Sequence, residues 1–330
     1  MLRINLQRRF GSWRVLPGGM ARIATAQGDI ASMQRGGSSA DVWVVTPPEQ
    51  AVDTTTLLAP HHSPATLAHS KRIVTSRAAE HLFWLGRYTE RTENSLRLSR
   101  LTLDCLNGDR RSSVPLLTWL GQMASNNVLV QSEVPMPAQR RRVFERSLVA
   151  SLANTAISGS VGYNLNCIKQ SAFAVRERLS EEHWKVIVHA QEEFFRRCAE
   201  YQSEGNYQTL DALRVLDTTS GYLAAITGAQ TDRMTRDDGW RLLSIGRHIE
   251  RLGFLAASLE LGFRTGSVHD ASGFEAMIAL FDSTITFHAQ YQQSHDVVAL
   301  LDLLVMDRDN PRSLGWVAQT LRGRLARLAG

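Results

Sequence analysis

The sequence predicts an all-α protein: an up-and-down helical bundle with an internal two-fold repeat, preceded by a small β-hairpin appendage. Two observations support this fold class. Apolar residues recur at helical spacing almost throughout the chain after residue 75, with short loops between the helical stretches. The stretch LFWLGRYTER at 82–91 also returns as LLSIGRHIER at 242–251, with Leu, Gly, Arg, Glu and Arg at matching positions. Many helices joined by short loops are typical of a bundle.

Composition places the chain among ordinary globular proteins. Hydrophobic residues make up 43% of the 330 residues and charged residues 21%, which is enough apolar material for a sizeable core. The net charge of +5 is small, and Lys and Arg are interleaved with acidic residues, as on a solvated surface. We therefore expect no nucleic-acid partner.

Signals for a membrane or an oxidising compartment are not found in the sequence. Its apolar runs are all shorter than the roughly 18–20 residues that a membrane-spanning helix needs, so we expect no membrane partner. The three cysteines, Cys105, Cys167 and Cys198, are isolated and odd in number. They indicate neither a disulfide framework nor a zinc site, and they fit the reducing cytoplasm.

Residues 1–45 form the first predicted domain, a β segment. Short strand patterns separated by turn residues cover 13–16, 20–24, 30–33 and 41–45. So few strands cannot bury a core alone, so we expect this segment either to pair with a missing partner or to be the remnant of a larger domain. Residues 46–75 are rich in Pro, Thr, Ser and His and are predicted to be a linker.

Residues 76–330 form the predicted helical domain. The helix of the second repeat copy is expected to start at a capping box at 235–238, and Gly108, Gly205 and Gly266 mark helix ends. The predicted helices cover 77–106, 114–124, 138–157, 162–179, 181–202, 207–228, 238–263, 271–291, 294–306 and 312–328.

Both copies of the repeat are predicted to be helices that approach a neighbouring helix closely. Neither copy contains Pro, and each places a glycine, Gly86 or Gly246, within an apolar face. A glycine in a helix costs about 1 kcal/mol against Ala, so its presence at the same point of both faces indicates close packing. The predicted faces consist of Leu82, Leu85, Gly86, Thr89 and Glu93 in the first copy and Leu242, Ile245, Gly246, Ile249 and Gly253 in the second.

The charged residues of the repeat form the candidate site. They are Arg87, Glu90 and Arg91 in the first copy and Arg247, Glu250 and Arg251 in the second. Each Glu lies at the border of an apolar face, one turn from an Arg. A semi-buried Glu–Arg network of this kind either fixes the register of two helices or binds a polar ligand or partner. Acid–base catalysis by Glu90 and Glu250 is a third alternative, which requires the two carboxylates to face each other in a pocket.

Sequence motifs for metal, nucleophile and phosphate chemistry are not found. Di-metal bundles use Glu-x-x-His pairs, and the sequence has none. It also has neither a Gly-x-Ser-x-Gly elbow nor a Gly-x-x-x-x-Gly-Lys-Ser/Thr loop. We therefore predict no metal, no cofactor and no catalytic residue.

Four landmarks of the helical region occur in order, at 79–94, 164–184, 237–251 and 310–313. On these residues the chain resembles the alpha-E family, bacterial helical domains that are named for a Glu-Arg motif and are otherwise of unknown function. The resemblance runs from about residue 75 to residue 329. It implies an all-helical domain and leaves the function open.

Two segments of the β region, LPGGMARIA at 16–24 and SMQRGGSSADVWV at 32–44, carry a second resemblance. They are similar to the tail of the circularly permuted ATP-grasp family, which are predicted carboxylate–amine ligases. Under this resemblance Arg22 and Arg35 are remnants of a ligase site. The family usually has Ser-Lys-Asp where this chain has Ser39-Ala40-Asp41, and the ATP-grasp body with its nucleotide-binding lobes and magnesium carboxylates is absent.

The second resemblance implies the C-terminal portion of a fusion, or a truncated gene product, that does not form amide bonds by itself. Its implied partners are a circularly permuted ATP-grasp ligase, in cis or in trans, and a peptide substrate. The leading hypothesis is an accessory helical domain that binds the ligase, its substrate or its product. The alternatives are a helical enzyme that acts on the ligase product through Glu90 and Glu250, and a purely structural interaction scaffold.

Overall fold

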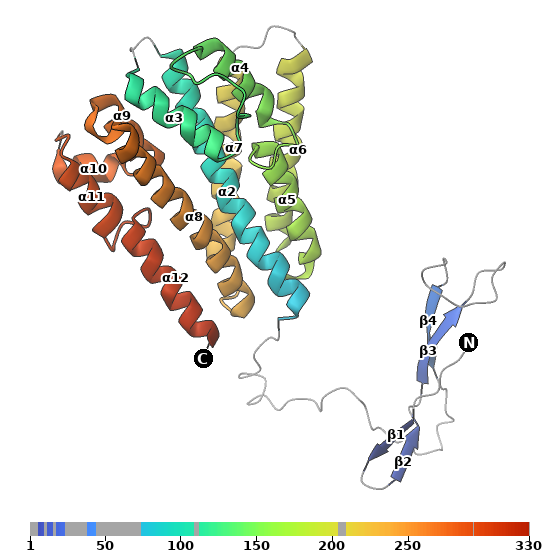
Figure 1. Ribbon diagram of the computed structural model, residues 1–330. Coiled ribbons are helices and arrows are strands. Elements are labelled where there is room, and N and C mark those ends of the chain that lie inside the picture. Colours follow the sequence, from blue (N-terminus) through green and yellow to red (C-terminus); the bar gives the residue numbers. More distant parts are fainter. Residues whose placement is uncertain are drawn as a thin grey trace. The chain divides into compact units, whose positions relative to one another are not determined.

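The computed structural model describes residues 6–9, 12–15, 18–23, 38–43, 74–108, 112–203, 209–292 and 294–329. The chain divides into two compact units, Met1–Ser70 and Lys71–Gly330. Strands occur in the first unit and helices in the second. Figure 1 shows the elements of both units.

The described residues of the first unit form two antiparallel two-stranded sheets. β1 (Leu6–Arg9) pairs with β2 (Ser12–Val15), and β3 (Gly18–Ile23) pairs with β4 (Ser38–Trp43). Strand β1 is not predicted by the sequence pattern, because its residues LQRR include only one apolar side chain.

The other strand predictions have different outcomes. Those at 13–16, 20–24 and 41–45 overlap β2, β3 and β4. The predicted strand at 30–33 lies outside the described residues, as does the predicted linker up to residue 73.

The second unit confirms the all-α prediction. Its α-helices are α2 (Ser76–Asn107), α3 (Val114–Asn126), α4 (Arg141–Leu152), α5 (Val161–Ala174), α6 (Glu181–Ser203), α7 (Thr209–Asp232), α8 (Asp238–Thr265), α9 (Ala271–Leu280), α10 (Thr284–Tyr291), α11 (Val297–Leu301) and α12 (Leu314–Ala329). The described residues of this unit also form two short 3-10 helices, Arg176–Arg178 and Ser267–His269, and a π-helical turn, Asp302–Met306.

Helix α2 is the central element of this bundle. It packs along α8 on one side and along α5 on the other, and it also contacts α7 (Figure 1). Helices α5, α6 and α7 pack in sequence against one another, while α12 packs against α8 and the π-helical turn. The interior is mostly apolar, and its largest fully buried side chains are Trp119, Phe144, Phe194, Phe274, Phe281 and Phe287.

Side-chain caps start both repeat helices. The Thr75 hydroxyl accepts a hydrogen bond from the Ala78 N–H at 3.2 Å, and the Asp237 carboxylate accepts one from the Trp240 N–H at 3.0 Å. Because Asp237 is the N-cap of α8, the predicted capping box, which starts at Thr235, lies two residues too early. Gly266 ends α8 with a left-handed φ of 73°, as the sequence predicts.

Two of the later predicted helices are not continuous helices in the structure. The predicted helix at 271–291 is broken into α9 and α10 at Asp282, whose φ is 54°. The break contains neither Gly nor Pro, and Asp is one of the residues that tolerates this left-handed conformation, so the pattern gives no signal for it. The predicted helix at 294–306 is the short helix α11 followed by the π-helical turn.

Two earlier predictions are too long at their ends. Helix α4 is confined to Arg141–Leu152 within the predicted 138–157, and α5 ends at Ala174 within the predicted 162–179. None of the described helices is sufficiently long and apolar to cross a membrane.

Candidate functional site

The two copies of the repeat lie in α2 and α8, and their glycines mark the point where these helices touch. A Cβ atom on Gly86 would lie 2.0 Å from the Leu243 carbonyl oxygen, and one on Gly246 would lie 2.2 Å from the Phe83 carbonyl oxygen. Both distances are far below van der Waals contact, so only glycine fits at either position. The predicted close approach is therefore confirmed, and each glycine faces the backbone of the other copy.

The close approach brings the charged residues of one copy against those of the other. Glu90 of α2 is fully buried, and both oxygens of its carboxylate are bound by Arg251 of α8. Arg251 donates from Nε to Oε1 at 2.6 Å and from Nη2 to Oε2 at 2.8 Å, a bidentate geometry that makes strong charge-assisted hydrogen bonds. Arg247 of α8 adds an ion pair at 3.3 Å.

The reciprocal pairing holds Glu250 of α8. Arg87 of α2 donates from Nε to Glu250 Oε1 at 2.8 Å, and Arg91 of α2 binds the same oxygen. This second cluster is more open, since the Glu250 side chain is 15% exposed and those of Arg87 and Arg91 are 26% and 31% exposed. Each carboxylate is thus held by the arginines of the opposite copy.

A further arginine joins the buried cluster from outside the repeat. Arg312, which precedes α12, lies 3.6 Å from the Glu90 carboxylate and donates a 2.5 Å hydrogen bond to Glu93. Arg97 also pairs with Glu93, at 3.0 Å. The buried cluster is therefore extended by the segment before α12, and Glu93, whose side chain is 13% exposed, adds a second acid beside Glu90.

A cavity of about 670 Å³ opens directly beside this cluster, between α7, α8 and α12. Arg247, Arg251 and Arg312, the three arginines that hold Glu90, also line the cavity. Glu90 and Glu250 themselves are not among its lining residues. The repeat therefore presents arginines, and not its two glutamates, to this cavity.

Trp240 forms a flat wall of the cavity. Its indole N–H donates to the Gln230 carbonyl oxygen at 2.8 Å, and two guanidinium groups lie over its ring. The guanidinium carbon of Arg324 is 4.4 Å from the ring centroid and that of Arg236 is 5.4 Å from it. Such cation–π contacts hold both arginines at the cavity. Trp316 of α12 contributes a second aromatic wall.

The fold and the crossed Glu–Arg pairs agree with what comparison of the sequence shows. Residues 74–330 match the family described as Alpha-E, a predicted alpha-helical domain with a conserved ER motif. The chain belongs to the Alpha-E family.

The Alpha-E domain also occurs within longer relatives. Uncharacterized proteins of Mycobacterium bovis and Mycobacterium tuberculosis are 28% identical over 334 residues, a match that covers 95% of this chain and 36% of each relative. The chain thus spans about a third of the length of these curated relatives. No solved structure matches the chain.

The electrostatics of the Alpha-E crossing keep the buried groups in fixed charge states. Burial alone would raise the pKa of Glu90, but the guanidinium groups of Arg251, Arg247 and Arg312 outweigh it and hold that pKa well below its usual range. Burial lowers the pKa of His248 to about 4, so this imidazole is neutral near pH 7. Its Nδ1 lies 2.6 Å from the Ser244 carbonyl oxygen.

The structure brings together all six candidate residues of the repeat, but it corrects the predicted face of the second copy. Ile249 is 38% exposed, and Gly253 has open space around it. Ile245 and Gly246 are buried as predicted, and the buried side of α8 also carries Trp240, Leu243 and Arg251. The apolar periodicity fails here because a Trp and an Arg occupy buried positions next to the expected stripe.

The two candidates in the first unit are less well defined. Arg22 lies in β3, opposite Ser39, and its side chain is not among those described. Arg35 lies outside the described residues. Within the described parts of the chain, no group of three or more His, Cys, Asp or Glu side chains is placed to hold a metal ion.

Sequence reasoning missed the residues that complete the site. Arg312 belongs to the 310–313 landmark, which is the one signal that could have identified it. Trp240 likewise belongs to the 237–251 landmark, whereas Arg324 belongs to none of the four. They become part of the site only through the packing of α12 on α8.

Proposed function

We propose that the Alpha-E domain is a binding module, an accessory part of an ATP-grasp peptide or amide ligase system. It binds the ligase's substrate or product and does not itself make or break bonds. One observation carries the proposal. Both glutamates of the repeat are paired with arginines of the opposite copy, and arginines that hold Glu90 also line a cavity beside them.

The longer relatives support the link to a second activity. Their match covers 95% of this chain, whereas the Alpha-E region starts at residue 74, so the relatives also match much of the first unit. That unit carries the segments similar to an ATP-grasp tail. We therefore propose that the helical domain follows a ligase in the chain or acts beside it as a partner. The three isolated cysteines fit a reducing compartment such as the cytoplasm.

The physical chemistry of the crossing argues against acid–base catalysis by the repeat. A general acid or base near neutral pH needs a pKa near the working pH. The pKa of Glu90 is far below that range because three arginines surround its carboxylate. Glu250 is bound by two further arginines, and neither carboxylate lines the cavity.

The same network also explains the scaffold alternative, but a structural role does not use the whole site. The crossed pairs and the glycines fix how α2 meets α8, which is a structural role. The cavity beside them is not needed for that role, and it supplies the space and charge for a ligand.

The test is recovery of the ligase. The tagged full chain is purified from its own cells at physiological salt, with the tag alone as the control, and bound proteins are identified by mass spectrometry. We expect an ATP-grasp protein in the first sample and not in the second. Absence of any ATP-grasp protein from repeated purifications would contradict the proposal.

A second measurement separates binding from catalysis. The purified chain is incubated with the product of the recovered ligase, and the product is followed by mass spectrometry. We expect it to stay unchanged. A conversion that Glu250→Gln abolishes would instead establish the enzyme alternative.

A further inference from the structure

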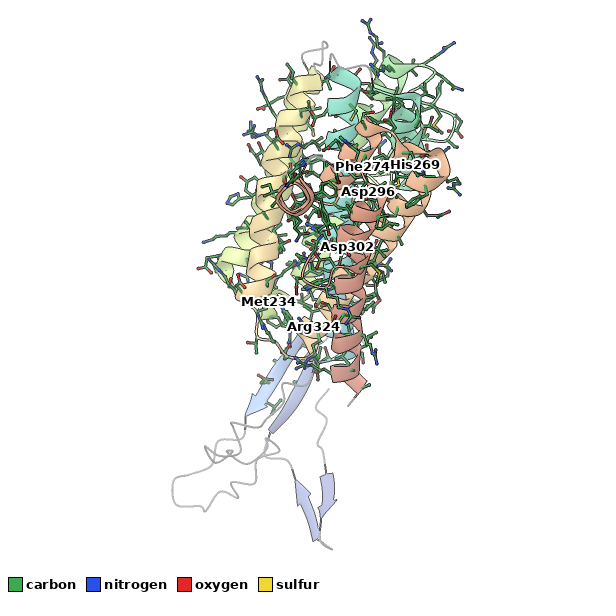
Figure 2. All side chains as sticks on the ribbon, turned by 90° about the vertical axis from the view of Figure 1, so that its left-hand side faces the viewer. Met234, His269, Phe274, Asp296, Asp302 and Arg324 are labelled. Carbon is green, nitrogen blue, oxygen red and sulfur yellow. The ribbon has the colours of Figure 1, made fainter. Side chains whose placement is uncertain are left out.

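One end of the cavity carries more positive charge than its surroundings neutralise. Arg236 and Arg324 line the main cavity, and a smaller hollow of about 270 Å³ beside it is lined by Arg308, Arg324 and Arg327. Trp316, Thr320 and Arg324 line both, so the two spaces adjoin. Figure 2 marks Arg324 at the same end of the domain as Met234 of the α7–α8 connection.

These arginines differ from the ones at the helix crossing. Arg247, Arg251 and Arg312 all reach Glu90 or Glu93. Across the described part of the chain, by contrast, no acidic side chain lies at ion-pair distance from Arg236, Arg308, Arg324 or Arg327. Burial and the neighbouring charges of Arg327, Arg236 and Arg241 lower the pKa of Arg324, as expected for a cation without a counter-ion.

Three residues that line the same cavity carry buried polar atoms without partners. Gln230 of α7 is 1% exposed, and its amide nitrogen donates to the Thr89 hydroxyl at 3.1 Å. Its amide oxygen is buried and accepts no hydrogen bond from the described residues. The Thr227 hydroxyl, one helical turn away, and Arg324 Nε are buried and unpartnered in the same way.

The unpartnered atoms indicate which ligand groups would form the missing hydrogen bonds. A buried polar atom left without a partner destabilises the protein, and a bound ligand that pairs with it recovers this loss. Arg324 Nε needs an acceptor, and a carboxylate supplies one together with the missing negative charge. The Gln230 oxygen needs a donor, and an amide N–H supplies it.

We propose that this cavity binds a short acidic peptide. Its carboxylates pair with Arg324 and Arg236, and its backbone N–H groups donate to Gln230 and Thr227. The ring of Trp240, which lies against both guanidinium groups, holds these two arginines at the cavity. This inference rests on the proposed function and deepens it by naming the class of ligand that the ligase system supplies or consumes.

Size and chemistry favour a peptide over a bare anion. A volume of about 670 Å³ falls within the roughly 300–1,000 Å³ of small-molecule sites, which suits a few residues. Inorganic phosphate would neutralise the arginines but, at the pH of the cell, would offer the Gln230 oxygen few donors. A peptide satisfies both needs at once.

The test is a calorimetric titration of the purified full chain with N-acetylated tetraglutamate. Tetraglutamine of the same length and inorganic phosphate serve as comparison probes. We expect tetraglutamate to bind, with an affinity that falls as salt rises, and the two other probes to bind at least tenfold more weakly.

Variants locate the site. We expect Arg324→Gln to weaken tetraglutamate binding roughly 10-fold to 100-fold, because it removes a charge-assisted contact. Thr227→Val should weaken it about fivefold through the loss of one neutral hydrogen bond. Arg322→Gln is the matched control, since Arg322 lies on the same helix, is exposed and does not line the cavity. Circular dichroism checks that each variant is folded.

Several outcomes would overturn the inference. They are the absence of tetraglutamate binding at millimolar concentration, equal losses in Arg324→Gln and Arg322→Gln, and phosphate binding as tight as peptide binding. These results are independent of whether the ligase is recovered with the chain. A chain that binds tetraglutamate but recovers no ligase would contradict the proposed partner while supporting the ligand.

Discussion

The two Glu–Arg clusters share one sequence motif but differ in their surroundings. Glu90 is fully buried and is reached by Arg251, Arg247 and Arg312, while Glu250 is 15% exposed and is reached by Arg87 and Arg91. The segment before α12 covers the first cluster: Arg312 contacts Glu90, and the Pro311 carbonyl oxygen accepts a 3.2 Å hydrogen bond from Arg251.

This difference shows that position in the fold, and not the motif, decides what a charged pair contributes. Taking charges out of water is costly, and a buried pair is stable only while every partner is in place. An exposed pair is screened by solvent and contributes little. Four substitutions or sets of substitutions should separate the two copies experimentally.

The largest effect is expected for Glu90→Gln. This change leaves the buried Arg251 and Arg247 without their counter-charge, so we expect the free energy of unfolding to fall by about 3–5 kcal/mol. Chemical denaturation followed by circular dichroism measures it. A loss no larger than that of Glu250→Gln would show that burial does not distinguish the clusters.

The same variant should change the response to acid. Because the pKa of Glu90 is depressed in the folded state, its stabilisation is present above its unfolded pKa of about 4.5 and is lost as the pH falls below that value. Glu90→Gln should therefore flatten the decline of stability below pH 4.5. An unchanged slope would argue that other carboxylates cause the decline.

Glycine substitutions test whether the crossing itself is symmetric. Gly86→Ala and Gly246→Ala each place a methyl group against a carbonyl oxygen, so we expect both to lose about 1–3 kcal/mol of stability or more. Gly253→Ala is the control: it lies in α8 with open space around it, and should gain up to about 1 kcal/mol from helix propensity. A loss at only one of the two crossing glycines would mean that the contacts are not equivalent.

The two copies also differ in one residue type: the first has Tyr88 where the second has His248. Because a histidine titrates near neutral pH, this difference should appear in how stability depends on pH. His248 has a pKa of about 4 when folded against 6.5 otherwise, so between these values the unfolded chain binds a proton that the folded chain does not. Stability therefore falls as the pH falls through this window, by roughly 2 kcal/mol from this group at pH 4.5.

Substitution of the imidazole tests that assignment. We expect His248→Gln to reduce the decline of stability between pH 6.5 and 4.5, measured by denaturation at several pH values. His183, whose pKa burial also lowers to about 4, remains in the variant and accounts for the rest of the decline. An identical pH profile in the variant and the parent would contradict the role of His248.

The smallest effect is expected for Glu250→Gln. The arginines around Glu250 are partly solvated, so we expect a loss of about 1 kcal/mol or less, which high salt should reduce further. Denaturation at low and high ionic strength measures it. A salt-independent loss of several kcal/mol would show that this cluster is energetically as buried as the first.

The parts of the fold that follow from local rules could be predicted from the sequence. The repeat, the helices that carry it and the glycine contact all follow from periodicity and from the unusual position of Gly86 and Gly246. The break at Asp282 could not be predicted, because a residue with a left-handed backbone and neither Gly nor Pro beside it leaves the helical pattern intact.

For the candidate site, the sequence predicts which residues of the repeat take part but not how they pair. The sequence identifies Glu90, Glu250 and their four arginines, but it does not show that each carboxylate is held by arginines of the other copy. Pairing between α2 and α8 depends on the crossing geometry. Arg312 and Arg324 enter the site from a segment far along the chain, and their positions depend on how α12 packs.

The packing of α12 affects how readily this helix opens from the rest of the bundle. This helix ends the described chain and contacts chiefly α8 and the π-helical turn, whereas α2 contacts α8, α5 and α7. A terminal helix with few neighbours opens at a lower free-energy cost than a central one, so its backbone amides should exchange with deuterium sooner than those of α2. A ligand held by Arg324 of α12 and Gln230 of α7 would tie these two helices together, and the exchange of α12 would then slow to the rate of the bundle.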